Sequence, residues 1–115
     1  MGAALLTGTA GPAAAASTCS GKLLGNWQIT GGYIAVYYNS STGNNCAMTY
    51  TNRPGVTQEI FVGISVWDST KEVTQTGNFK YYAGPVSVYA KGKCIGIEGR
   101  VGGGTTHGVG PLYCD

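Results

Sequence analysis

The clearest pattern of apolar and polar positions in this chain is a strict alternation over residues 59–67. Apolar side chains occupy every second position, at Ile60, Val62, Ile64 and Val66. Small or polar residues fall between them, at Glu59, Gly63 and Ser65. A period of two residues is typical of a strand with one buried face, so the even positions are expected to point inward. Phe61 and Trp67 interrupt the polar face, which predicts that they cover a second layer or lie at a sheet edge.

Two earlier runs of strand-forming residues are separated by a polar turn. Residues 33–38 predict one strand, and residues 46–50 predict the strand that returns after the turn at 40–45. A further turn is predicted at Asn52-Arg53-Pro54-Gly55, because proline presets its own φ and glycine tolerates positive φ. The first half of the chain therefore predicts antiparallel hairpins.

The segment after residue 70 also has the composition of strands. Residues 73–82 predict one continuous strand, with a bulge or irregularity at Gly77-Asn78. Pro85 lacks a backbone donor, so it predicts the end of pairing or a sheet edge.

The last third of the chain predicts one more hairpin and an edge. Residues 86–89 and 94–97 flank Lys91-Gly92-Lys93, which predicts a turn between two paired strands. The glycines at 102–104 predict a loop, and residues 105–114 predict an edge strand or a loop held by its cysteine.

These segments together predict an all-β fold. No window outside the first 16 residues shows a sustained period of 3.6 residues. Many short strands with frequent turns favour a small antiparallel β-sandwich or barrel. No linker or internal repeat divides the chain, so we expect residues 17–115 to form a single β-domain.

The first 16 residues have the composition of a secretory signal. They are rich in alanine, and residues 14–16 fit the small-residue cleavage pattern. No Lys or Arg precedes Lys22, so the positively charged opening segment is missing. We therefore expect residues 1–16 to be a truncated signal peptide that is cleaved on export; the alternative is an Ala/Gly-rich tail of a cytosolic protein. No segment is long and apolar enough to predict a membrane span.

The cysteines carry the strongest structural expectation. There are four of them: Cys19, Cys46, Cys94 and Cys114. In an exported domain this number predicts two disulfides, for which three pairings are open. Cys19–Cys46 and Cys94–Cys114 are favoured because they join sequence neighbours and close the shorter loops. A metal site is disfavoured, since there is no C-x-x-C pair and His107 is the sole histidine, and no cofactor is predicted.

Charge excludes some partners. Seven Lys and Arg residues against five Asp and Glu residues give a formal net charge of +2, without a basic run. Such a chain is a poor electrostatic match for a phosphate backbone or for an acidic lipid surface. Nucleic-acid binding is therefore not expected.

The residues able to support catalysis are sparse. His107 lies in a glycine-rich segment without a nucleophile motif beside it. The carboxylates are Glu59, Asp68, Glu72, Glu98 and Asp115. A glycosidase needs two of them facing across a cleft, and no spacing indicates such a pair. We interpret these groups as surface residues and predict that the protein is not an enzyme; a small hydrolase that uses His107 is the least favoured alternative.

Aromatic residues are numerous for a domain of this size. Neighbouring tyrosines at 37 and 38, and at 81 and 82, must point to opposite faces of their strands. Exposed tyrosines would form a platform for sugar stacking or protein binding, whereas the alternative is that they close a thin core with wet hydroxyls. The predicted binding residues are Tyr38, Trp67 and Tyr82.

Several stretches resemble the spore-associated protein A family of filamentous actinobacteria. The most specific are Val36 to Cys46, with its Asn-Cys turn, and Phe79 to Val86, with Tyr-Tyr-Ala-Gly-Pro. Gly92-Lys93-Cys94 and the penultimate Cys114 also fit. The resemblance implies a small secreted protein found with aerial hyphae and spores, without known catalytic residues. This chain departs from the family after Cys94, where it has Ile-Gly-Ile-Glu-Gly in place of Lys-Trp-Gly-Gly.

The resulting expectation is a secreted, non-enzymatic protein of the spore or hyphal envelope. It is expected to act as a structural or surface-binding module, with a cell-wall or spore-surface component as its partner. The alternative is a small secreted protease inhibitor that presents the turn at residues 52–55, although proline after the arginine argues against substrate-like display.

Overall fold

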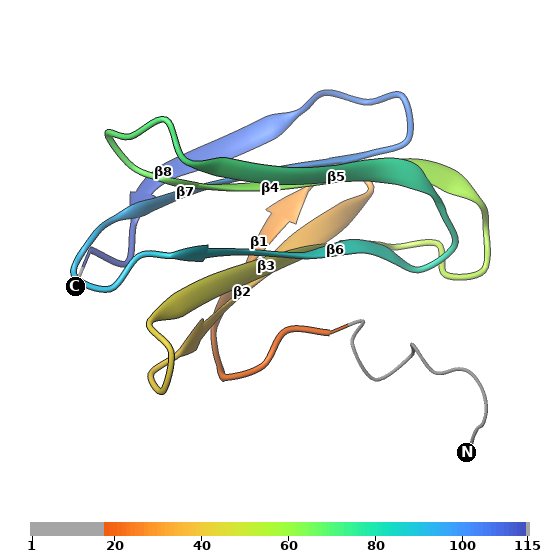
Figure 1. Ribbon diagram of the computed structural model, residues 1–115. Coiled ribbons are helices and arrows are strands. Elements are labelled where there is room, and N and C mark those ends of the chain that lie inside the picture. Colours follow the sequence, from red (N-terminus) through yellow and green to blue (C-terminus); the bar gives the residue numbers. More distant parts are fainter. Residues whose placement is uncertain (1–17, 115) are drawn as a thin grey trace, which may run out of the picture.

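The computed structural model describes residues 18–114 and consists of two antiparallel sheets that face each other (Figure 1). The strands are β1 (Lys22–Ile29), β2 (Gly32–Asn39), β3 (Asn44–Thr51), β4 (Gln58–Val66), β5 (Glu72–Phe79), β6 (Tyr82–Tyr89), β7 (Ile95–Val101) and β8 (His107–Leu112). Sheet A has the order β1-β2-β3-β6 and sheet B the order β5-β4-β7-β8. The arrangement is an open sandwich, not a closed barrel, which confirms the all-β prediction. The expected signal peptide over residues 1–16 lies outside the described residues.

The core lies between the sheets and follows from the alternation in β4. Ile60, Val62 and Ile64 are at most 1% exposed, and Val66 is 7% exposed, as the period of two predicts. They share one buried cluster with inward-facing residues of sheet A, among them Ile34 and Val36. Within residues 18–114 there is no helix, and so none that could cross a membrane.

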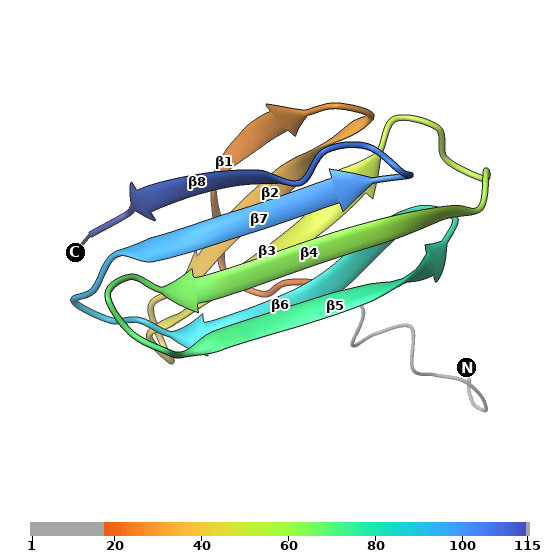
Figure 2. The same cartoon turned by 90° about the horizontal axis from the view of Figure 1, so that it is seen from above.

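The strand predicted over residues 73–82 is in fact two strands. β5 ends at Phe79, and β6 begins at Tyr82 in the other sheet, so Lys80-Tyr81 forms the corner between the sheets. Figure 2 shows β5 and β6 side by side along one edge of the sandwich. The bulge expected at Gly77-Asn78 is also absent, because both residues pair with β4 in unbroken register.

The hairpin predicted around Lys91-Gly92-Lys93 is wrong as well. β6 pairs with β3 in sheet A, whereas β7 pairs with β4 and β8 in sheet B. The connection over residues 90–94 therefore crosses from one sheet to the other. The turn residues were recognised correctly, but two inward-facing strands look the same in sequence whether they pair within a sheet or face each other across the core.

Other expectations are confirmed. The cysteines pair as Cys19–Cys46 and Cys94–Cys114. Pro85 lies in β6, an edge strand of sheet A, opposite a register shift between Ala47 and Thr49. The glycines at 102–104 lie in a turn, and β8 is an edge strand of sheet B. β1 was not predicted, because its apolar pattern is interrupted by a bulge between Leu23 and Gly25.

Candidate functional site

Two connections at one end of the sandwich form a single rigid surface, which we name the loop end (residues 66–71 and 89–94). Residues 67–71 join β4 to β5, and residues 90–94 carry the chain from β6 to β7. Asp68 has a φ of 61° and Gly92 a φ of 75°, conformations that aspartate tolerates and glycine favours in tight turns. These two residues explain why the chain reverses so sharply at both places.

Backbone hydrogen bonds hold the two connections in place. Within the first, the Val66 amide donates to the Lys71 carbonyl at 3.1 Å. Within the second, the Lys93 amide donates to the Ala90 carbonyl at 2.9 Å. The Trp67 amide joins them by donating to the Cys94 carbonyl at 2.9 Å, and the Cys94–Cys114 disulfide anchors Cys94 to the segment that follows β8. The surface is therefore preorganised, so little ordering would be needed when a partner binds.

Trp67 and Tyr89 are the exposed aromatic residues of the loop end. Their exposed fractions are 41% and 55%. The six-membered ring of Trp67 lies over two glycines: a Cβ at Gly110 would come within 2.4 Å of Trp67 Cζ3, and one at Gly96 within 3.3 Å of Cε3. Glycine at both positions is thus what allows the indole to lie against the outer face of sheet B. The ring borders a hollow of about 250 Å³ that Glu72 also lines.

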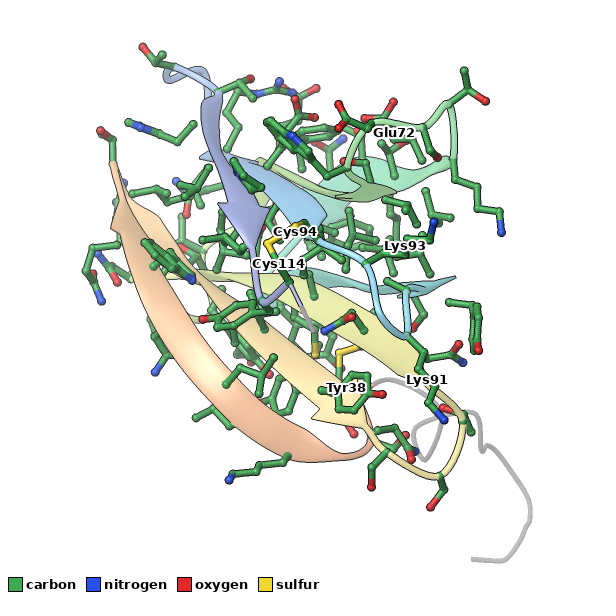
Figure 3. All side chains as sticks on the ribbon, turned by 90° about the vertical axis from the view of Figure 1, so that its left-hand side faces the viewer. Tyr38, Glu72, Lys91, Lys93, Cys94 and Cys114 are labelled. Carbon is green, nitrogen blue, oxygen red and sulfur yellow. A yellow bond between two sulfur atoms is a disulfide. The ribbon has the colours of Figure 1, made fainter. Side chains whose placement is uncertain are left out.

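Three lysines of the loop end surround a second hollow. Lys71, Lys91 and Lys93 line a volume of about 340 Å³, which Val66, Ser69 and Tyr89 complete. A third hollow of about 300 Å³ adjoins it, shares Lys93, and is bordered by Trp67 and Asp68. Figure 3 shows Lys93 between Glu72 and Lys91, with all three on the same side of the Cys94–Cys114 disulfide. Trp67 and Tyr89 thus border different hollows, which adjoin at Val66, Ser69 and Lys93.

Tyr82, one of the predicted binding residues, lies elsewhere, in a packed group that we name the tyrosine cluster (Tyr33, Tyr37, Tyr50 and Tyr82). The register places Tyr33, Tyr50 and Tyr82 in one row across the outer face of sheet A. The Tyr33 and Tyr50 rings stack with centroids 5.1 Å apart, and the Tyr50 and Tyr82 rings tilt at 5.6 Å. All four side chains are half-buried.

The tyrosine cluster covers Met48, which is fully buried although it faces away from the main core. The Tyr50 hydroxyl donates to Met48 Sδ at 3.4 Å. Burial raises the pKa of the Tyr50 phenol above its ordinary value, and the neighbouring phenols of Tyr37, Tyr33 and Tyr82 raise that pKa further. The cluster thus acts as a second, smaller core, in agreement with the alternative in which tyrosines close a thin interior.

Tyr38, the third predicted binding residue, points to the other side of β2. It lines a cavity of about 120 Å³ between the sheets, together with Leu24, Asn45, Ala90 and Tyr113. Tyr38, Trp67 and Tyr82 therefore lie on three separate parts of the molecule and form no joint site. Sequence reasoning missed a different group of residues: Tyr89 at the end of β6, Lys91 and Lys93 on the crossover, and Lys71 on the β4–β5 connection.

The groups considered for catalysis are dispersed. His107 accepts a hydrogen bond from the Thr30 amide at 3.4 Å, which links β8 to the turn after β1. Glu59 pairs with Arg100 at 3.0 Å, and the guanidinium of Arg100 lies 5.4 Å from the centroid of the Phe61 ring. In the part of the chain from 18 to 114, no three His, Cys, Asp or Glu side chains gather where they could hold a metal ion.

The turn at residues 52–55, expected to be the contact loop of an inhibitor, is folded back on itself. The Val56 amide donates to the Arg53 carbonyl at 3.1 Å, and the Gly55 amide donates to the Lys80 carbonyl at 2.9 Å. Inhibitor loops that imitate a substrate present an extended backbone to the protease. The closed geometry of this turn therefore does not favour the inhibitor alternative.

Comparison with known proteins gives one relative. The chain is 34% identical over 71 residues to Spore-associated protein A of Streptomyces coelicolor. The match covers 62% of this chain and 46% of the relative, so the chain spans about half the length of that protein. This similarity supports the resemblance seen in the sequence. No family model matches the chain. No solved structure matches it either.

Proposed function

We propose that this chain is a secreted, non-enzymatic protein of the spore or hyphal envelope that binds a surface component there through the loop end. Two observations that do not concern the loop end support the envelope role and the export. The relative is named for its association with spores. The chain also closes all four of its cysteines into disulfides, which form and persist in oxidising compartments such as the cell exterior.

The observation that carries the binding role is the exposure of Trp67 and Tyr89 on a rigid surface. Large aromatic side chains contribute much of the binding energy of interfaces, and they lose little conformational freedom when they are already held in place. Both residues are more than 40% exposed, and hydrogen bonds and a disulfide fix the connections that carry them. An envelope component that packs on these rings would bury apolar surface that now faces water.

Retention of the purified, oxidised protein on isolated spores, hyphal walls and chitin tests this function. We expect wild type to be retained on at least one surface, and the Trp67→Ala/Tyr89→Ala variant to be lost from it. Val56→Ala/Tyr81→Ala is the matched control, because these side chains are 40% and 57% exposed and lie on turns away from the loop end. If nothing retains wild type, or if both variants bind as it does, the proposed function is wrong.

Export is tested separately, by a non-reducing peptide map of protein recovered from the culture medium and from washed spores. We expect the two disulfides and an N-terminus near residue 17. Protein found only inside the cells, with free thiols, would contradict secretion.

A further inference from the structure

The three lysines of the loop end line one hollow that no described carboxylate lines. Lys71 comes from the β4–β5 connection, and Lys91 and Lys93 come from the β6–β7 crossover. Within residues 18–114 the one ion pair joins Arg100 to Glu59, so no described carboxylate lies within 4 Å of these ammonium groups. The nearest acids along the chain line other hollows: Asp68 borders the adjoining one, and Glu72 borders that of Trp67.

The walls of this hollow are apolar, although its rim is charged. Val66 is buried at its floor, and the ring of Tyr89 forms one side. Tyr89 packs beside Gly43, where a Cβ would come within 2.6 Å of Tyr89 Cε1. The ring is thus held next to Lys91 by contacts within the fold. A ligand that fits must combine negative charge with carbon groups that can lie against an aromatic face.

The geometry points to an anionic polymer whose repeating units carry phosphodiesters, bound with its phosphates on Lys71, Lys91 and Lys93 and its polyol or sugar carbons against Tyr89. We propose this as the ligand class of the loop end. The proposal rests on the proposed function, because the protein would meet such a polymer in the spore or hyphal envelope. Lysine ammonium groups are compact point charges with several donors each, which suits tetrahedral phosphate oxygens. A neutral glycan would leave all three charges unpaired.

Nucleic acid carries the same phosphodiester charge, but it suits this surface less well. Proteins that bind single strands follow the backbone with a long basic groove and stack successive bases on several rings. Here three lysines converge on one hollow beside a single ring, that of Tyr89, and do not line a long groove. We therefore favour a wall-type polymer over a nucleic acid.

Binding of the oxidised protein to poly(glycerol phosphate) tests the proposal. The comparison ligands are neutral dextran, polygalacturonate as a carboxylate polymer, and single-stranded DNA with the same number of phosphates. We expect poly(glycerol phosphate) to bind most tightly and to bind more weakly as NaCl is raised from about 50 mM to about 300 mM. Preference for the carboxylate polymer, for DNA or for dextran would overturn the proposal.

Two variants that remove equal charge locate the site. Lys91→Gln/Lys93→Gln should weaken binding of poly(glycerol phosphate) about tenfold or more, because charge-assisted hydrogen bonds are lost. Arg53→Gln/Lys80→Gln removes two exposed cations elsewhere and should change the affinity by about twofold or less. Equal losses in both variants would indicate attraction to the whole molecule and would overturn the hollow as the site.

The isolated walls separate this proposal from the proposed function. Treatment with cold hydrofluoric acid cleaves phosphodiesters, so treated walls should lose retention of wild type. If walls retain wild type equally before and after treatment, the phosphodiester ligand is wrong and the envelope role stands. If wild type binds poly(glycerol phosphate) but no wall or spore surface, the envelope role is wrong and the chemistry of the hollow stands.

Discussion

The tyrosine cluster and the loop end are both rich in aromatic residues, yet their rings have opposite surroundings. In the cluster, ring contacts Tyr33–Tyr50 and Tyr50–Tyr82 close over a fully buried Met48. At the loop end, Trp67 and Tyr89 are 41% and 55% exposed, and neither contacts another ring in the described part of the chain. Rings that cover one another contribute to the stability of the fold. Rings left open on rigid connections indicate a surface that binds something else.

This difference corrects an inference that treats all surface tyrosines alike. Tyr82 faces outward, as strand alternation predicts, but it packs on its neighbours across the sheet and is half-buried. Tyr89 also faces outward, but it lies at the end of β6, beyond the row of tyrosines. Position along the strand, and not the face alone, decides whether an outward tyrosine is covered. The predictions below test this contrast.

Removing either disulfide should have the largest effect on stability, and the two disulfides should differ in their effect on binding. Cys19–Cys46 joins residues 27 apart and Cys94–Cys114 residues 20 apart, so each should contribute about 3 kcal/mol or slightly more by restricting the unfolded chain. Replacing either pair by serine should lower the free energy of unfolding by that amount in urea titrations.

Binding should respond to one disulfide and not to the other. Cys46 lies on the outer face of sheet A, whereas Cys94 accepts the hydrogen bond from Trp67 that joins the two connections. Measured where both variants are folded, retention on walls should fall for the Cys94/Cys114 variant alone. Equal loss in both would show that binding depends on general stability and not on the loop end.

Met48→Ala should have the next largest effect on the free energy of unfolding. The side chain is fully buried beneath the tyrosine cluster, and truncation of a buried methionine leaves a cavity, which should cost about 2–3 kcal/mol of unfolding free energy. Leu23→Ala is the control on the same sheet, since that side chain is 45% exposed and should cost about 0.5 kcal/mol or less. Similar values for the two would mean that the cluster is not a second core.

The sequence predicted the parts of the fold that depend on local pattern. Alternation in residues 59–67 gave the buried face of β4, and the polar turn at 40–45 gave the β2–β3 hairpin. Both disulfides were predicted because these pairings join sequence neighbours and close the shorter loops. It failed at Lys80-Tyr81, where strand-forming residues continue through a corner without glycine or proline. A chain that changes sheets at such a place leaves no local signal.

The candidate site could be predicted only in part, for the same reason. Trp67 stood out because it interrupts a polar face. It is 41% exposed, but the sheet edge that was one of the two expectations is wrong, since β4 lies between β5 and β7. Its neighbours Lys91 and Lys93 were seen as turn residues, but a hairpin would have placed them beside β6 and β7 in one sheet. The crossover instead brings them against the β4–β5 connection. Contacts between sheets are set by tertiary packing, which strand periodicity does not encode.

The pH dependence of stability should report the tyrosine cluster. Because the folded-state pKa of Tyr50 is raised above the unfolded value of 10.0, both states keep the proton at lower pH and the contribution to stability is complete there. As the pH rises from the unfolded pKa of 10.0 towards the higher folded-state pKa, the unfolded chain loses its proton first, so the free energy of unfolding should fall. Unfolding in urea at about pH 9 and about pH 11 measures this, and ultraviolet absorbance follows tyrosinate formation. Tyr50→Phe should reduce this loss of unfolding free energy. If the loss is unchanged in the variant, it arises from other titrating groups.

The smallest effect on stability should come with a clear effect on binding. Tyr89→Ala removes a ring that is 55% exposed, so the free energy of unfolding should change by about 0.5 kcal/mol or less, while retention on walls falls. Tyr82→Ala removes a ring that packs on Tyr50 and should cost about 1 kcal/mol or more, while retention stays at the wild-type level. Denaturant unfolding and wall binding, measured on the same two preparations, show which of the two regions carries the binding surface. If Tyr82→Ala abolished retention and Tyr89→Ala did not, the binding surface would lie on the outer face of sheet A, and the exposed rings of the loop end would need another explanation.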